Sequence, residues 1–157
     1  MDLSLQQDRC LNNDFFRLLT GSYQRLVGKL LVNAEHSVER AVHWLYDEAT
    51  FCVLAHDTVA DPHFIYANRA AQRCFGYSWD EFLTLPSRLS AEQPNRAERQ
   101  RLLDAVTRQG FIADYTGWRI SKTGRRFLIE DGTIWQLIDE LGVIHGQAAT
   151  FSRWREA

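Results

Sequence analysis

Apolar residues recur at helical spacing in the first third of the chain. One stripe begins just after Asp14 and contains Phe15, Leu19, Tyr23, Leu26 and Leu30. A second stripe contains Ala34, Val38, Ala41, Leu45 and Ala49. Steps of three and four residues are typical of amphipathic helices, so we predict two helices before the first strand. Gly21 and Gly28 weaken the first helix and are positions where it can break or kink.

The two predicted helices can have either of two roles. They can pack on the domain and complete its core, or one of them can form the seam of a homodimer. Phe16 and Leu18 lie beside the first stripe and add more apolar surface than one covering helix needs. We therefore predict a homodimer through the helix in residues 14–31, and the core-completing role stays open beside it.

Two short strands and a capped helix are predicted in the middle of the chain. Residues 51–56 form a compact apolar run, and a turn connects them to a second strand, 63–67. That strand stops at Asn68, whose side-chain oxygen can accept a hydrogen bond from an amide of the first helical turn. The helix 69–75 follows, and Gly76 stands where the chain must adopt a left-handed conformation to leave it.

Two further helices are predicted before the last third of the chain. Ser78 and Glu81 have the spacing of a capping box, and Tyr77 and Phe82 have the spacing of a hydrophobic staple. A longer helix, 94–109, begins with a proline and is followed by a glycine, as helix boundaries require.

The last third of the chain predicts a sheet. Residues 111–121 and 125–137 are rich in strand-forming residues, and Lys-Thr-Gly at 122–124 joins them as a hairpin. Residues 143–154 form the predicted final strand. Three consecutive apolar residues, 127–129, indicate that both faces of the sheet are covered there.

Composition and charge describe an ordinary single globular domain. The chain has 157 residues, of which 45% are hydrophobic and 24% charged, and its net charge is -2. This charge gives no basic face for nucleic acid. No apolar run approaches the length of a membrane span, and the first residues lack the pattern of a charged segment followed by an apolar one that is typical of a signal peptide. We divide the chain into a tail (1–13), a helical region (14–50) and a core (51–157).

The three cysteines are odd in number, and they share no metal-binding spacing. A reducing cytoplasm is the simplest location for such a chain.

The order of helices, two strands, helices and three strands resembles that of PAS domains. The phrase Asn68-Arg69-Ala70-Ala71 followed by Phe75-Gly76-Tyr77-Ser78 also resembles the PAS pattern. The resemblance implies an α+β fold with a five-stranded antiparallel sheet whose first and last strands are adjacent at its centre. Helices would cover one face of this sheet, and we expect the N-terminal helices to cover the other.

Longer phrases resemble one PAS-like family, the MEKHLA domain family. They are Asp61-Pro62 with Tyr66-Ala67-Asn68, Leu85-Pro86-Ser87-Arg88-Leu89-Ser90-Ala91-Glu92, Tyr115 with Gly117 and Arg119-Ile120-Ser121, Thr123-Gly124-Arg125-Arg126-Phe127, and Gly146-Gln147-Ala148-Ala149-Thr150-Phe151 with Trp154. The resemblance extends from about Phe15 to Trp154 and is to the stand-alone bacterial type, since the hexapeptide that names the family is absent. It implies a sensory or regulatory role and specifies neither ligand nor chemistry.

Neither a covalent flavin adduct nor haem is expected. Light-sensing PAS domains carry their reactive cysteine in a region that corresponds here to 86–92, which holds none, and Cys74 lies earlier, on a helix where it can pack in the core. Haem-binding PAS domains commonly take a histidine from the long helix, and residues 94–109 contain none. Non-covalent flavin binding stays open. The cofactor is therefore unknown.

A metal site is also not predicted. His56, Asp57, Asp61 and His63 offer four possible ligands around one turn. Their spacing matches no metal motif, and the two aspartates also suit turn formation.

The final strand contains the main candidate for a ligand site. Alternation places Gln147 and Ala149 on one face, with Phe151 next along it. Small residues at a sheet centre leave volume that either a ligand or the aromatic side chains Phe75, Trp79 and Phe82 must fill. Arg119 lies between Trp118 and Ile120 and is a candidate to contact a partner or a ligand carboxylate. The predicted ligand-binding residues are Gln147, Ala149, Arg119, Phe151, Tyr66, Phe75, Phe82 and Arg88.

We therefore expect a PAS-like sensory domain, not an enzyme, that binds a small, partly apolar molecule between helices and sheet. A ligand-free module for dimerisation or partner binding is the alternative. A small-molecule-processing enzyme is the third hypothesis.

Overall fold

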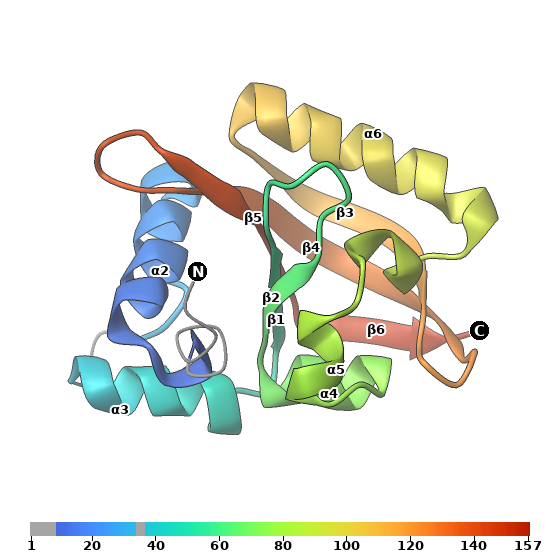
Figure 1. Cartoon of the computed structure of the whole chain (residues 1–157), viewed down its shortest axis with the longest axis horizontal. Coiled ribbons are helices and arrows are strands. Elements are labelled where there is room, and N and C mark those ends of the chain that lie inside the picture. Colours follow the sequence, from blue (N-terminus) through green and yellow to red (C-terminus); the bar gives the residue numbers. More distant parts are fainter. Residues whose placement is uncertain (1–8, 34–36) are drawn as a thin grey trace.

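The structure is a computed structural model that describes residues 9–33 and 37–157 (Figure 1). Its helical elements are the 3-10 turn η1 (Arg9–Leu11), α2 (Asn13–Val27), α3 (Val38–His43), the π-helical turn η2 (Trp44–Glu48), α4 (Arg69–Phe75), α5 (Trp79–Leu83), the 3-10 turn η3 (Ser87–Ser90) and α6 (Gln93–Gln109). Its strands are β1 (Cys52–His56), β2 (Phe64–Ala67), β3 (Phe111–Ile120), β4 (Arg126–Ile138), β5 (Ile144–Phe151) and β6 (Arg153–Glu156).

The strands form one antiparallel sheet in the order β2-β1-β5-β4-β3, with β6 also paired to β4. The first and last long strands, β1 and β5, are adjacent at the centre, as the PAS resemblance implied. The expected fold class is confirmed, but the described sheet has six strands instead of five. The predicted final strand, 143–154, is interrupted at Ser152, and β6 continues on β4 in the same register: Thr133 pairs with Thr150, and Glu130 pairs with Arg153.

Helices cover both faces of the sheet, so there are two apolar cores. On one face α4, α5 and α6 lie over the sheet, and on the other lie α2, α3 and η2 (Figure 1). β5 supplies both cores in alternation. Ala149 and Phe151 belong to the core under α4 to α6, whereas Ala148 belongs to the core under α2.

The N-terminal helix α2 covers the second face through buried Leu19 and Tyr23. Tyr23 packs edge-on against Trp135 with ring centroids 4.8 Å apart, and the Trp135 Nε1 donates a hydrogen bond to the Leu19 carbonyl at 3.3 Å. The helix ends at Gly28, whose φ of 81° is left-handed, so Leu30 lies beyond it and is exposed. Packing on the sheet thus accounts for the apolar stripe, and the homodimer remains a prediction.

The second predicted helix is shorter than its stripe suggested. α3 ends at His43, and the chain continues through the π-helical turn η2 to Glu48. Ala34, the first residue of that stripe, and residues 1–8 of the predicted tail lie outside the described residues.

The signals around Asn68 are confirmed. Asn68 caps α4 by accepting a hydrogen bond from the Ala71 amide at 3.1 Å, and Gly76 ends that helix with a φ of 77°. Ser78 and Glu81 form the capping box of α5. The staple residues Tyr77 and Phe82 pack with ring centroids 5.3 Å apart.

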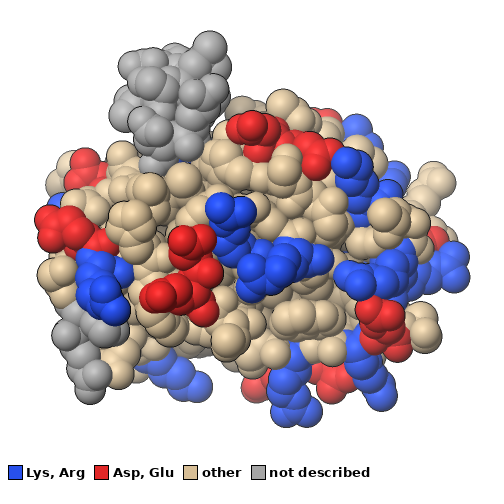
Figure 2. All heavy atoms as spheres, turned by 90° about the horizontal axis from the view of Figure 1, so that it is seen from below, with Lys and Arg blue, Asp and Glu red and all other residues tan. Residues whose placement is uncertain are grey.

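Charged side chains of both signs share the surface. On the face seen from below, Lys and Arg side chains lie beside Asp and Glu side chains (Figure 2). Within residues 9–33 and 37–157, no helix is long and apolar enough to cross a membrane.

Candidate ligand-binding site

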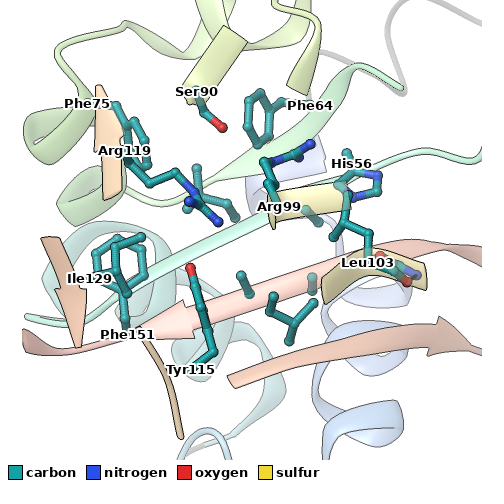
Figure 3. Close-up of a pocket in the computed structure, with 16 residues that line it drawn as sticks. His56, Phe64, Phe75, Ser90, Arg99, Leu103, Tyr115, Arg119, Ile129 and Phe151 are labelled. Carbon is teal, nitrogen blue, oxygen red and sulfur yellow. Dashed lines mark hydrogen bonds between the residues drawn. The ribbon is translucent and has the colours of Figure 1, made fainter. Parts of the chain in front are cut away.

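A cavity of about 50 Å³ lies between the sheet and the helices α4 to α6 (Figure 3). Its polar lining consists of His56, Ser90, Arg99, Tyr115, Arg119 and Gln147. Its apolar lining includes Leu54, Phe64, Phe75, Leu103, Ile129, Ile134 and Phe151. The central strands β1 and β5 form its floor, where β5 presents only small residues besides Gln147 and Phe151. The cavity therefore combines an aromatic wall with several buried polar groups.

Arg99 enters the cavity from α6 and is only 8% exposed. It lies four residues before Leu103 and seven before Val106, so it occupies the buried stripe of its own helix. Its guanidinium has no hydrogen bond or ion pair with any described residue. Burial, and to a smaller extent the positive charge of Arg119, lower the pKa of Arg99 to about 10.

Arg119 enters from β3 and is 7% exposed. Strand alternation turns it and Tyr115 inward, while Trp118 is exposed on the opposite face. One guanidinium nitrogen of Arg119 donates to the Trp118 carbonyl at 2.7 Å, and the guanidinium carbon lies 5.7 Å from the centroid of the Tyr115 ring. Figure 3 shows the Tyr115 hydroxyl pointing toward this guanidinium. Burial raises the pKa of Tyr115, and the two arginines partly offset that effect.

Gln147 of β5 is tied to α6 by its amide nitrogen. This nitrogen donates hydrogen bonds to the Leu103 carbonyl at 3.2 Å and the Thr107 hydroxyl at 3.0 Å. The Leu103 carbonyl requires a donor, which fixes the orientation of the amide. The Gln147 Oε1 is buried and has no hydrogen-bond partner among the described residues.

His56, at the end of β1, has a similar unsatisfied atom. Its Nδ1 lies 2.9 Å from the Asp57 carbonyl, so Nδ1 carries the proton and Nε2 is an acceptor in the neutral ring. That Nε2 is buried and lacks a partner among the described residues. Burial lowers the pKa of His56 to about 4, the Asp57 carbonyl opposes the shift, and the charge of Arg99 adds to it. The ring is therefore neutral at pH 7.

A larger groove of about 490 Å³ lies immediately outside the cavity. His56, Arg99, Leu103 and Gln147 line both spaces. These four residues form the wall between the cavity and the groove, and the groove opens to solvent beside the loop after β1.

Five of the eight predicted ligand residues line the cavity. They are Gln147, Ala149, Arg119, Phe151 and Phe75. Phe82 stands behind this wall, packing edge-on against Phe64 and Phe75 with centroid distances of 5.2 and 6.0 Å.

Arg88 and Tyr66 lie elsewhere. Arg88 lines the outer groove, where its Nε forms an ion pair with Asp61 at 3.1 Å. Tyr66 lies on the opposite face of the sheet, 5.4 Å from Phe15 between ring centroids. A bulge between Ala55 and His56 causes this placement: it shifts the pairing of β1 with β2, so that Phe64 and Tyr66 face different cores.

Arg99, His56, Ser90 and Tyr115 line the cavity but were not predicted as ligand residues. Arg99 had a readable signal, because a basic residue falls on the apolar stripe Leu103 and Val106 of α6. His56 was considered only as a metal ligand. Ser90 lies in a segment without periodicity, so nothing in the sequence places it at the cavity.

The structure gives local roles to the residues considered for cofactors and metals. Cys74 is buried against Cys52, and this contact, together with burial, raises the pKa of the Cys52 thiol. Asp57 organises the turn after β1 by accepting a hydrogen bond from the His63 amide at 3.1 Å. In the described part of the chain, no group of three or more His, Cys, Asp or Glu side chains is placed to hold a metal ion.

Solved structures show that this is the PAS fold. A crystal structure of the PAS domain of a protein from Colwellia psychrerythraea is 19% identical with a TM-score of 0.59, covering 76% of this chain and 94% of that one. A light-oxygen-voltage domain studied with a flavin analogue is 16% identical with a TM-score of 0.58, covering 78% and 86%. A PAS domain from a two-component sensor histidine kinase is 19% identical with a TM-score of 0.56, covering 75% and 95%. No curated protein matches the chain.

The fold, a central antiparallel sheet with helices over it, defines a PAS-like domain. The family model for the MEKHLA domain matches residues 13–156, nearly the whole chain. The chain belongs to the MEKHLA domain family.

Proposed function

We propose that this chain is a sensory or regulatory domain that binds a small, partly apolar molecule in the cavity between α6 and the sheet, and that it is not an enzyme. The observation that carries the proposal is the cavity's lining. Aromatic side chains stand beside two buried acceptor atoms without partners, Gln147 Oε1 and His56 Nε2. Buried polar atoms without partners are costly, so a bound molecule, together with water beside it that can donate to these two atoms, would stabilise the fold.

The size of the cavity limits the ligand. A buried water needs roughly 10–15 Å³ of such volume, so about 50 Å³ corresponds to a few water molecules. A molecule of several non-hydrogen atoms fits this space, and a flavin ring system does not fit it without rearrangement of α6. We therefore predict that the purified protein shows neither flavin nor haem absorption.

α6 and α2 provide routes for transmitting a signal. Gln147 connects the cavity floor to α6 through Leu103 and Thr107, so a ligand that competes for the Gln147 amide would change how α6 is held. On the other face of the sheet, Trp135 of β4 is bonded to α2. A structural change at the cavity can therefore be transmitted to α6 through β5, and to α2 through β4.

A ligand-free partner-binding module is the second candidate, and one observation favours it. The loop between β4 and β5 and the first residue of β5 expose apolar side chains close together in the sequence: Leu141 is 90% exposed, Val143 51% and Ile144 46%. Such a patch is typical of protein contacts.

Native mass spectrometry beside the denatured mass tests the proposal. We expect a non-peptide mass that stays with the folded chain and is lost on denaturation. Folded protein without additional mass, which also fails to bind any compound in a ligand screen, would favour the partner-binding module. Turnover of the retained molecule would identify an enzyme.

A further inference from the structure

Two arginines face the cavity, and none of the described residues that line it carries a negative charge. Arg99 comes from α6 and Arg119 from β3, and both side chains are more than nine-tenths buried. Figure 3 shows the two side chains approaching the cavity from different elements. Their mutual repulsion is large enough for Arg119 to lower the pKa of Arg99.

No described residue of the cavity lining neutralises this pair. Among the described residues that line the cavity there is no Asp or Glu. The bond from Arg119 to the Trp118 carbonyl is to a neutral acceptor, and Arg99 has no hydrogen bond with a described residue. The other polar groups of the lining, His56, Ser90, Tyr115 and Gln147, are neutral at pH 7. A buried cation without an anion is expensive, and two of them in one cavity indicate that an anion belongs there.

We propose that the cavity binds a short-chain organic carboxylate, with its carboxylate held by Arg99 and Arg119 and its hydrocarbon part against Phe75, Ile129 and Phe151; the proposal rests on the sensory function proposed above. A guanidinium presents its donors in a planar fork that matches the two oxygens of a carboxylate. The remaining wall is aromatic and aliphatic, which suits a hydrocarbon chain and not a fully hydrated inorganic anion.

Access to the site is through the outer groove. Arg99 lines both the groove and the cavity, so an anion that passes from one space to the other contacts this guanidinium, whereas Arg88 in the groove is paired with Asp61. Arg99 and Leu103 are one helical turn apart on α6, and they separate the two spaces together with Gln147 and His56. A small displacement of α6 therefore admits the ligand.

The test compares straight-chain carboxylates with neutral isosteres on the full chain. The melting temperature is measured at pH 7 with sodium salts from acetate to hexanoate, with butyramide as the uncharged match of butyrate, and with phosphate and sulfate, all at equal ionic strength. We expect a saturable rise with butyrate or a neighbour in the series, as linkage requires of a ligand that binds the folded state. Butyramide, phosphate and sulfate should give a smaller rise or none.

Two variants and one control locate the effect. Arg99→Met and Arg119→Met keep the apolar stem and remove the charge, and each should weaken carboxylate binding by roughly tenfold or more in calorimetric titration. The ligand-free variants should melt at or above the temperature of the unmodified chain, because an uncompensated buried charge has been removed. Arg101→Met, on the exposed side of the same helix, should leave carboxylate binding unchanged.

Several outcomes would overturn the carboxylate assignment. Butyramide could match butyrate, phosphate or sulfate could exceed every carboxylate, or Arg101→Met could weaken binding as much as the two cavity variants. The comparison of butyrate with butyramide needs no variant, so it shows whether binding requires the carboxylate charge even if a substitution prevents folding. Retention of a neutral molecule in native mass spectrometry would end the carboxylate proposal and leave the sensory function standing. No retained mass and no thermal shift with any compound would end both.

Discussion

Ala148 and Ala149 are neighbours in β5, and their side chains belong to the two different cores of the molecule. Ala148 is buried under α2, where it is paired across the strands with Trp135. Ala149 faces α4 to α6 and lines the cavity, which Ala148 also borders although it packs in the other core. The same substitution at the two positions therefore compares a filled core with an open one.

Ala149→Leu should cost little stability and should abolish ligand retention. The added side chain enters the cavity, whereas in Ala148→Leu it meets a filled core, for which overpacking costs about 1–3 kcal/mol. We expect the free energy of unfolding of ligand-free Ala149→Leu to lie within about 1 kcal/mol of the unmodified chain, as measured by urea denaturation. Equal destabilisation by the two substitutions would show that the cavity is effectively packed.

The carboxamide of Asn68 supports a second prediction, on stability. Its oxygen accepts hydrogen bonds from the amides of Val53 and Ala71, and its nitrogen donates to the carbonyls of Leu45 and Phe51. The residue is fully buried, so these backbone groups have no water to replace the lost bonds. Asn68→Ala should lower the free energy of unfolding by at least about 3 kcal/mol, because it removes a helix cap and leaves buried groups unpaired.

Asn12→Ala is the matched control for Asn68→Ala. Asn12 also caps a helix, but among the described residues its side chain makes a single hydrogen bond, accepted from the Phe15 amide at 2.8 Å, and it is only partly buried. Its loss should cost about 1 kcal/mol. Similar losses for the two variants in denaturant titrations would mean that Asn68 acts as a helix cap alone.

The homodimer through residues 14–31 remains a prediction that light scattering coupled to size exclusion can decide. Leu19 and Tyr23 are buried within the chain, so a seam must use what α2 and its flanks still expose, such as Leu11 and Leu30. We expect a dimer at micromolar concentration that Leu11→Glu together with Leu30→Glu weakens. A monomeric full-length chain would contradict the prediction, and so would a dimer that the paired substitution leaves unchanged.

Local signals allowed most of the fold to be predicted. The Asn68 cap, the left-handed Gly76 and the capping box of Ser78 and Glu81 depend on a few neighbouring residues, and each lies where its pattern placed it. The central position of β5 came from the PAS resemblance. The break at Ser152 was not predicted, because both sides of it are strand-forming and keep one register on β4.

The site was harder to predict, because it depends on contacts between distant elements. Alternation within the final strand indicated Gln147, and Arg119 was indicated by its place between Trp118 and Ile120. Tyr66 was misplaced because the bulge beside His56 reverses alternation in β2, and no residue type in either strand indicates it. Arg99 lies on the apolar stripe of α6, but its place in the cavity follows only from the packing of that stripe against the sheet, which the sequence of the helix does not specify.

His56 gives the last prediction, a loss of stability in mild acid. Burial lowers the pKa of its ring from 6.5 to about 4. Below about pH 6.5 the unfolded chain therefore binds a proton that the folded chain does not, and the free energy of unfolding falls as pH decreases, by at most about 1.4 kcal/mol per pH unit from this group. The loss is complete near pH 4, where the folded chain also becomes protonated.

Urea denaturation between about pH 7 and pH 4.5 should show a shallower decline of the free energy of unfolding in His56→Gln than in the unmodified chain. His43→Gln, which changes an exposed histidine at the end of α3, should keep the original slope. If His56→Gln has the same slope as the unmodified chain, the buried ring does not control stability in this range.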